Sequence, residues 1–278
     1  METVGNAGRN FTGFIINQIK MIKETAEIRT ADKLKVKIYE SRLLMGAYAA
    51  YDAGEKVKEL LAKQELVNIV FAAAPSQNEF LDFFSQSEVD WSRINAFHMD
   101  EYIGLNRNAP ERFGNFLKRR LFDRVPFHEV HYLNGNTGDP AMECRLYTEL
   151  LQEYPTDIVC LGIGENTHLA FNDPHVADFN DPYLVKVVNL AEASRQQQVN
   201  DGCFARIEDV PGSALTLTIP ALLRANAAYC IVPGSNKAQA VYHTLHSEVT
   251  EAYPSTVLRT HNNATLYLDR GSWEKCKL

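Results

Sequence analysis

The stretch LVNIVFAAAPSQNEFLDFFSQ, residues 66–86, joins a continuous apolar run to an amphipathic segment. The run at 66–74 is short and rich in branched side chains, which is typical of a strand buried on both faces. The segment at 77–86 reads as a helix. We therefore predict a strand followed by a helix, which is the repeating unit of a parallel sheet.

The same alternation continues along the chain. A strand with one wet face is expected at 33–40, where KLKVKIYE alternates with period two. Further strands are expected at 94–102, 157–164, 227–233 and 264–269, and helices at 41–64, 109–122, 141–154, 194–201 and 235–246. The predicted fold class is α/β, Rossmann-like, with a mostly parallel sheet and helices on both faces. We expect one domain over 1–278, with 1–32 as an N-terminal helical extension.

Composition excludes several classes of protein. The apolar fraction of 45% and the charged fraction of 23% are those of an ordinary globular protein. A formal charge of −7 disfavours nucleic acid as a partner, because binding phosphate backbones requires a basic face. No stretch reaches transmembrane length and no secretory signal stands at the start, so we expect no membrane partner and a cytoplasmic location.

The five cysteines are widely spaced and form no CxxC pair. Most lie in apolar segments, which favours buried reduced thiols over disulfides or a metal site. They are Cys144, Cys160, Cys203, Cys230 and Cys276.

Ligands of open parallel sheets bind beyond the carboxyl ends of the strands, so the loops at 75–79, 99–105, 164–174 and 234–237 are candidates. In the second of these, Asp100 and Glu101 directly follow a predicted strand and should point to opposite faces. One acid can enter a pocket and lose hydration, which raises its proton affinity as a general base requires. The alternative is that both acids only solvate or cap a loop.

The third loop, ENTHLAFND, places a histidine among polar groups. Asn166 and His168 share a face of an extended backbone, and Asp173 can fold back onto the imidazole. A side-chain oxygen against one ring nitrogen would fix the tautomer and free the other nitrogen for proton transfer. The alternative, given equal weight, is that His168 only makes a structural hydrogen bond within the loop.

Two cations stand near predicted helix starts. Arg195 and Lys237 each follow a predicted strand and face the positive end of a helix dipole, which costs about 0.3–1 kcal/mol each. A phosphate bound by the free backbone N–H groups would turn this cost into a site. The alternative is a pair of solvated side chains.

Three segments in this order resemble the glucosamine-6-phosphate deaminase (isomerase) family: FHMDEYIGL (97–105), GIGENTHLAFNDP (162–174) and GSNKA (234–238). The resemblance runs from about residue 66 to about residue 245. It implies a single α/β domain without metal or redox cofactor. The implied reaction converts glucosamine 6-phosphate to fructose 6-phosphate and ammonia, with a hexosamine phosphate as the small-molecule partner and a homo-oligomer as a possible assembly.

The resemblance also assigns roles to individual residues. Asp100 falls on the base that moves a proton between C2 and C1 of the open-chain sugar. His168 falls on the histidine that assists ring opening, and Asp173 on its acidic partner, more often glutamate. Arg195 and Lys237 fall on the phosphate ligands.

At three places the chain departs from the family pattern. Asn166 and Thr167 stand where the family commonly has aspartate and glycine, and a β-branched residue is strained if that backbone needs a positive φ. AAAPSQNEF replaces a glycine-rich phosphate loop; Ser76 is kept as a phosphate-binding candidate. Ser76 and Glu79 also fit a capping box, S-x-x-E.

Two other functions fit parts of the pattern. A 6-phosphogluconolactonase-type hydrolase would share the G-x-G-x-x-x-H block but usually follows it with a T-A-S-type sequence and lacks M-D-E-Y. The sequence LAFN at 169–172 therefore favours the deaminase. A sugar-phosphate-binding sensor without catalysis is the third hypothesis, suggested by the departures at 73–79, Asn166 and Thr167. Glucosamine and galactosamine phosphates both fit the pattern.

Overall fold

The computed structural model describes residues 26–277. Its main feature is an eight-stranded sheet in the order β1-β2-β11-β10-β7-β3-β4-β6, in which every neighbouring pair is parallel except β1 and β2. The strands are β1 (Glu27–Ala31), β2 (Leu34–Tyr39), β3 (Val67–Phe71), β4 (Ile94–His98), β6 (Glu129–His131), β7 (Ile158–Leu161), β10 (Ala227–Val232) and β11 (Ala264–Asp269). The mostly parallel sheet that the alternation predicted is confirmed.

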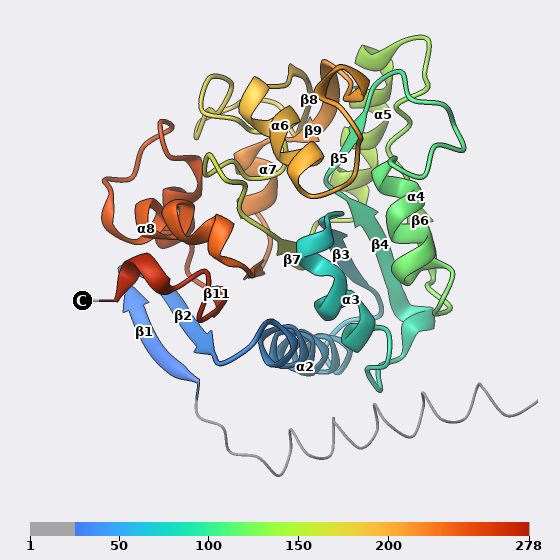
Figure 1. Cartoon of the computed structure of the whole chain (residues 1–278). Coiled ribbons are helices and arrows are strands. Elements are labelled where there is room, and N and C mark those ends of the chain that lie inside the picture. The colour runs from blue at the N-terminus through green and yellow to red at the C-terminus, as the bar shows by residue number, and fades with distance from the viewer. Residues whose placement is uncertain (1–25, 278) are drawn as a thin grey trace, which may run out of the picture.

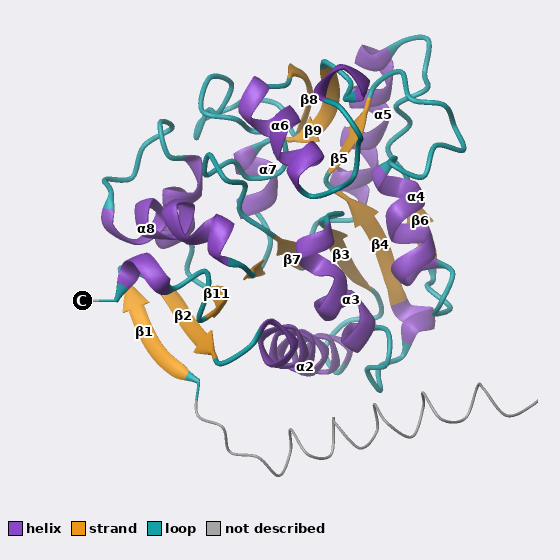
Figure 2. Cartoon of the chain, viewed as in Figure 1, coloured by secondary structure: helices purple, strands orange, loops and turns teal. Residues whose placement is uncertain are grey.

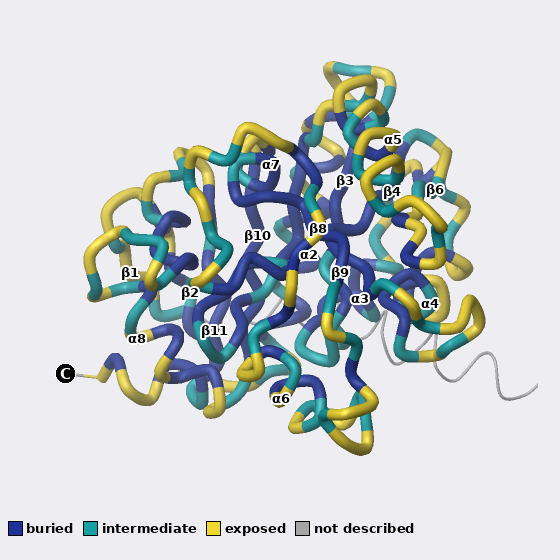
Figure 3. Tube along the Cα trace, turned by 90° about the horizontal axis from the view of Figure 1, so that it is seen from above, coloured by how far each residue is buried: buried dark blue, intermediate teal, exposed yellow. Residues whose placement is uncertain are grey.

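Helices cover both faces of the sheet, as predicted (Figures 1 and 2). One face packs against α2 (Arg42–Leu61), α3 (Asn78–Phe84) and α4 (Phe113–Leu117), and the other against α5 (Pro140–Glu153), α7 (Ile219–Leu223) and α8 (Ala238–His246). A further helix, α6 (Glu192–Asn200), follows strand β8 (Val185–Asn189). The two faces form separate hydrophobic clusters, and β3, β4, β7 and β10 are buried throughout (Figure 3). Continuous apolar strands follow from this double cover.

A second, antiparallel sheet has the order β5-β9-β8, with β5 (Asp100–Tyr102), β9 (Ser213–Leu217) and β8 (Val185–Asn189). The single strand predicted at 94–102 is therefore wrong, because the chain changes sheets at Met99. The backbone N–H of Met99 donates to Phe71 of the large sheet (3.3 Å), while its carbonyl accepts from Leu217 of the small sheet (2.7 Å). This crossover delivers Asp100 to the small sheet.

Two predicted helices are corrected. Residues 27–31 of the expected N-terminal helical extension form a strand, and residues 1–25 lie outside the described residues. This strand turns back onto β2 through Asp32, whose φ of 50° suits a tight hairpin. The helix predicted at 109–122 begins only at Phe113 and continues as a π-helix over Lys118–Phe122. It begins there because a buried carboxylate, described below, binds the first N–H groups of the helix.

The strand order reverses direction around β7. From β3, the strands β4 and β6 are added in turn toward one edge of the sheet. The next strand along the chain, β7, lies on the other side of β3 and pairs with β3 and with β10. The loops that leave the carboxyl ends of β3, β7 and β10 lie at the same edge of the sheet, which is where open α/β sheets bind ligands. Within residues 26–277, no helix combines the length and apolar character needed to cross a membrane.

Candidate active site

The loop after β7 is built around Gly164. A β-carbon added there would lie 2.1 Å from Cε1 of His168 and 2.3 Å from both ring nitrogens. The N–H of Gly164 donates to the carbonyl of His168 (3.0 Å), which closes the loop into a turn. Glycine at this position therefore lets the imidazole lie directly against the backbone.

Three polar groups surround Nδ1 of His168. It lies 2.7 Å from Oδ1 of Asn166, 3.0 Å from Oγ of Ser194 and 3.3 Å from Oδ1 of Asp173. The amide oxygen of Asn166 can only accept, so a consistent network places the proton of a neutral ring on Nδ1. Nε2 then carries the lone pair that can accept a proton. The structure brings these predicted residues together, and the nearest partner of the ring is the amide.

Asp173 organises this cluster from behind. Its Oδ1 accepts from Nδ2 of Asn166 (2.9 Å) and from the hydroxyl of Ser194, and its Oδ2 accepts from the N–H of Ala191 (2.9 Å). Burial by itself raises the pKa of Asp173, but the contacts with His168, Asn166 and Ser194 outweigh it and hold the pKa well below the usual range. Asp173 is thus a permanent carboxylate that orients both the amide and the hydroxyl.

Thr167 carries the strain that the sequence predicted. Its φ is 71°, a left-handed conformation that a β-branched residue adopts at a cost of about 1–3 kcal/mol. Two backbone contacts hold it: its N–H donates to Gly164 (2.9 Å), and its carbonyl accepts from Ser255 (2.9 Å). The threonine is buried, so its side chain packs where glycine would leave space.

Asp100 lies on the short strand β5 and is 7% exposed. Its carboxylate accepts no hydrogen bond from any residue within 26–277, which leaves it available to a ligand. Burial, with the negative charge of Glu101 as a smaller cause, raises the pKa of Asp100 well above its usual range. Glu101 is fully buried and Asp100 nearly so, so the acids do not solvate a loop. Glu101 does act as a cap, because it accepts from the first N–H groups of α4.

One threonine of β9 connects the acid to the histidine loop. Thr216 is the partner of Asp100 in the β5–β9 ladder, and its hydroxyl accepts from the N–H of Phe171, which is three residues after His168 (3.1 Å). Asp100 and the loop 164–173 therefore share one support, although no hydrogen bond within 26–277 joins Asp100 to His168.

Lys237 follows β10 and is 4% exposed, yet its ammonium group makes no hydrogen bond or ion pair within the described part of the chain. Burial lowers the pKa of Lys237, and the negative charges of Asp201 and Glu165 oppose this shift. The next residue back, Asn236, donates to Glu165 (2.9 Å), which ties the loop after β10 to the loop after β7. A buried ammonium without a partner is suited to an anionic ligand.

Arg195 lies on α6, next to Ser194 of the histidine cluster. Its Nη2 donates to the carbonyl of Ile207 (2.7 Å), and Nε and Nη2 both donate to that of Val210 (3.2 and 3.1 Å). These contacts fix the guanidinium and leave Nη1 without a partner in the described chain.

The loop after β3 departs from its prediction. Ser76 and Glu79 do not form a capping box: neither the 3₁₀ turn at Pro75–Gln77 nor α3 has a side-chain cap. The reason is that Arg42 binds Glu79 (2.7 Å) and the carbonyl of Pro75, which draws the acid away from the helix start. Ser76 instead accepts from Nε2 of Gln77 (3.1 Å).

Three functional candidates were missed from the sequence: Ser194, Gln77 and Thr216. Gln77 is 1% exposed, donates to Ile231 of β10 (3.1 Å), and has a buried Oε1 without a partner in the described chain. None of these residues is part of a sequence motif that indicates a functional site. The one available indication was that Ser194 stands next to Arg195, a predicted phosphate ligand. The described residues contain no group of three or more His, Cys, Asp or Glu side chains that could hold a metal ion.

Comparison with known proteins identifies the family of the chain. The family model described as "Glucosamine-6-phosphate isomerases/6-phosphogluconolactonase" matches residues 41–267. A glucosamine-6-phosphate deaminase of Exiguobacterium sp. is 33% identical over 79% of this chain and 85% of its own, and one of Bacillus cereus is 33% identical over 81% and 84%.

Solved structures show the same fold. A monomeric glucosamine-6-phosphate deaminase superposes with a TM-score of 0.80 at 26% identity, over 86% of this chain and 99% of the other. A 6-phosphogluconolactonase of Thermotoga maritima gives a TM-score of 0.68 at 17% identity, over 85% of this chain and all of the other, which shows the fold alone. The chain belongs to the glucosamine-6-phosphate isomerase/6-phosphogluconolactonase family.

Proposed function

We propose that this chain converts glucosamine 6-phosphate and water to fructose 6-phosphate and ammonia. The observation that carries the proposal is the buried Asp100 carboxylate, without a partner in the described chain, on the same support as the His168 cluster. Relatives at 33% identity over about four fifths of the chain are glucosamine-6-phosphate deaminases. The five cysteines are all free, which favours the reducing cytoplasm as its location.

The assigned roles follow from the contacts. His168, with Nδ1 held by Asn166, offers Nε2 to take the proton from the C1 hydroxyl and return one to the ring oxygen as the sugar opens. Asp100 then takes the proton from C2 and delivers it to C1. Water hydrolyses the resulting imine at C2 and releases ammonia. Proton transfer within one substrate requires no cofactor.

The phosphate is proposed to bind at Lys237, Arg195 and Ser76. The ammonium of Lys237 and Nη1 of Arg195 are both without partners in the described chain. The N–H groups of Ser76 and Ala74 also make no hydrogen bond there, and they follow the carboxyl end of β3. Free N–H groups at a turn are good phosphate donors, even where the glycine-rich sequence is absent.

The test is ammonia and fructose 6-phosphate release by the purified protein from glucosamine 6-phosphate. Galactosamine 6-phosphate tests the C4 configuration, and N-acetylglucosamine 6-phosphate, which lacks the free amine, should yield no ammonia. Hydrolysis of 6-phosphogluconolactone without ammonia release from any hexosamine phosphate would overturn the proposal. Tight sugar-phosphate binding without turnover would also overturn it, and would indicate a sensor.

Activity should be lost on the acidic side at an unusually high pH. A general base works only when deprotonated, so kcat falls as the pH drops through the Asp100 pKa. Because burial raises that pKa, the fall should occur well above the value of about 3.9 for a solvated aspartate. The measurement is kcat at saturating substrate, with circular dichroism at each pH as the control for folding. A midpoint at about pH 4 would contradict the assignment.

Gly164→Ala should displace the imidazole of His168. The new methyl would stand 2.1–2.3 Å from three ring atoms, so the ring must move. Misplacement of about 1 Å lowers rates about 100-fold, and we expect kcat to fall by about this factor. Gly138→Ala is the matched control, because a β-carbon there meets no atom within 4 Å. Equal kcat values for the two variants would show that the ring position is not important.

A further inference from the structure

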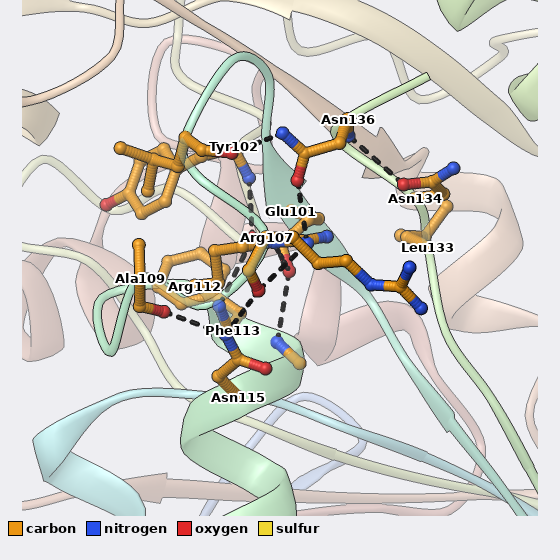
Figure 4. A network of polar contacts seen from close by, with 12 residues as sticks. Glu101, Tyr102, Arg107, Ala109, Arg112, Phe113, Asn115, Leu133, Asn134 and Asn136 are labelled. Atoms are coloured by element: carbon orange, nitrogen blue, oxygen red, sulfur yellow. Dashed lines mark hydrogen bonds and ion pairs between the residues drawn. The ribbon is translucent and has the colours of Figure 1, made fainter.

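Glu101 is the centre of a buried polar network (Figure 4). Its Oε1 accepts from the N–H groups of Tyr102 (2.9 Å) and Phe113 (3.2 Å), and its Oε2 accepts from that of Gly114 (3.1 Å). Nε of Arg112 lies 3.3 Å from Oε2. Every contact comes from a donor, so both oxygens act as acceptors, as an ionised carboxylate does.

The partner cation is itself fixed. Arg112 is 8% exposed, and its Nη1 donates to Oδ1 of Asn136 (2.8 Å) (Figure 4). Gly135 makes room for the network, because a β-carbon there would lie 1.8 Å from the carbonyl oxygen of Tyr102 and 3.1 Å from Cγ of Glu101. The short strand β5 is therefore clamped between two loops.

Asp100 depends on this clamp because its own carboxylate has no partner in the described chain. Its backbone is held on one side by His98, whose Nδ1 donates to the Asp100 carbonyl (2.9 Å) and whose Nε2 accepts from the N–H of Leu133 (2.9 Å). Burial lowers the pKa of His98 to about 4, so this ring remains neutral. On the other side, Glu101 is the next residue along β5.

The charges around Asp100 come from few groups. Glu101 is the charged neighbour that raises the Asp100 pKa in addition to burial. Burial raises the pKa of Glu101, and Arg112 with three backbone N–H groups opposes this shift. Burial also keeps Tyr102 and Tyr147 neutral by raising the pKa of each above its usual range. Glu101 therefore contributes to the local field at Asp100 and helps to fix the direction of its strand, and Arg112 acts on Asp100 through Glu101.

We propose that Glu101, with Arg112, is a positioning residue for the reaction: it fixes strand β5 so that the Asp100 carboxylate is presented to the substrate, and its charge contributes to the electrostatic field at Asp100. The expected change in kcat rests on the proposed function, whereas the expected titration of Asp100 does not. Nothing in it requires Glu101 to touch the substrate.

The test combines Glu101→Gln, Arg112→Gln and the exposed control Glu88→Gln. Glu101→Gln replaces one acceptor by an NH₂ group that meets backbone donors, and we expect kcat to fall about 10–100-fold with KM changed less than about twofold. The Asp100 carboxyl is then titrated by ¹³C NMR in each variant, assigned with Asp100→Asn. Loss of the Glu101 charge should lower the Asp100 pKa. Loss of Arg112 should raise it, because the Glu101 carboxylate is still held by three backbone N–H groups and its charge is then unopposed.

Opposite shifts in the two variants, with kcat lowered and the control unchanged, support the proposal. A merely structural role would lower thermal stability and active fraction without moving the titration, and an unshifted Asp100 pKa in both variants overturns it. If Glu101→Gln does not fold, Arg112→Gln decides, because only an upward shift supports the proposal. A wild-type protein that releases no ammonia would refute the proposed function, while the titration still tests the clamp.

Discussion

Asp100→Asn should lower kcat for ammonia release about 1,000-fold, within the range that general acid–base catalysis contributes. The amide keeps the shape of the side chain but cannot accept the C2 proton. KM should change little, because the phosphate group is bound elsewhere and does not react. The measurement is steady-state ammonia release with glucosamine 6-phosphate, with Asp123→Asn, an exposed aspartate, as the matched control.

The same substitution should stabilise the protein. The pKa of Asp100 is raised in the folded state, so folding favours the protonated acid and the charged form is costly at any pH above the folded pKa. The amide resembles the protonated acid, and the melting temperature at pH 7–8 should rise. A variant that is inactive and less stable would indicate damage to the fold, and one that keeps full activity would remove Asp100 from the mechanism.

The sequence predicts most of the sheet because its central strands are buried on both faces. β7 and β10 are continuous apolar runs and β3 is interrupted by Asn68 alone, and each is found within about three residues of its predicted bounds. The strand predicted at 94–102 fails because hydrophobicity continues through Met99 while the hydrogen-bond partner changes from one sheet to another. Periodicity records burial and not the partner strand, so the crossover could not be read.

The histidine cluster was predictable where its members are close in sequence. Asn166, His168 and Asp173 lie within one loop, and their convergence needs only one tight turn. Ser194 joins the cluster from α6, and the fold alone brings it there. Its contacts with Asp173 and His168 give the ring a hydroxyl partner beside the neutral amide of Asn166.

Charges that pair over long sequence distances were the hardest to predict. The S-x-x-E pattern at Ser76 is a helix cap by local rules, but Arg42, thirty-seven residues before Glu79, binds that acid instead. A tertiary ion pair thus overrides a local propensity. Glu101 shows the same effect. The alternation of side chains along a strand places it on the face opposite Asp100, but it does not reveal that three backbone N–H groups donate hydrogen bonds to its carboxylate there.

Lys237→Met should weaken phosphate binding and at the same time stabilise the empty protein. Methionine keeps the length and the packing but removes the ammonium that is proposed to hold the phosphate. We expect KM for glucosamine 6-phosphate to rise about 100-fold, which is the loss of a charge-assisted contact of about 3 kcal/mol. Because the phosphate does not react, kcat should fall much less.

The gain in stability follows from the burial of Lys237. The pKa of Lys237 in the folded protein is lower than the value of about 10.4 in the unfolded chain, so the unfolded chain binds the proton more tightly. The buried ammonium therefore destabilises the folded state, and this destabilisation is complete at any pH below the folded pKa. Removing this charge should add about 1–2 kcal/mol to the free energy of unfolding at pH 7, measured by urea denaturation. The gain should diminish as the pH rises through the folded pKa, and inorganic phosphate should stabilise the wild type more than the variant.

Exposed Lys275→Met is the control. A destabilised Lys237→Met protein with unchanged KM would show that this ammonium serves the fold and not an anionic substrate.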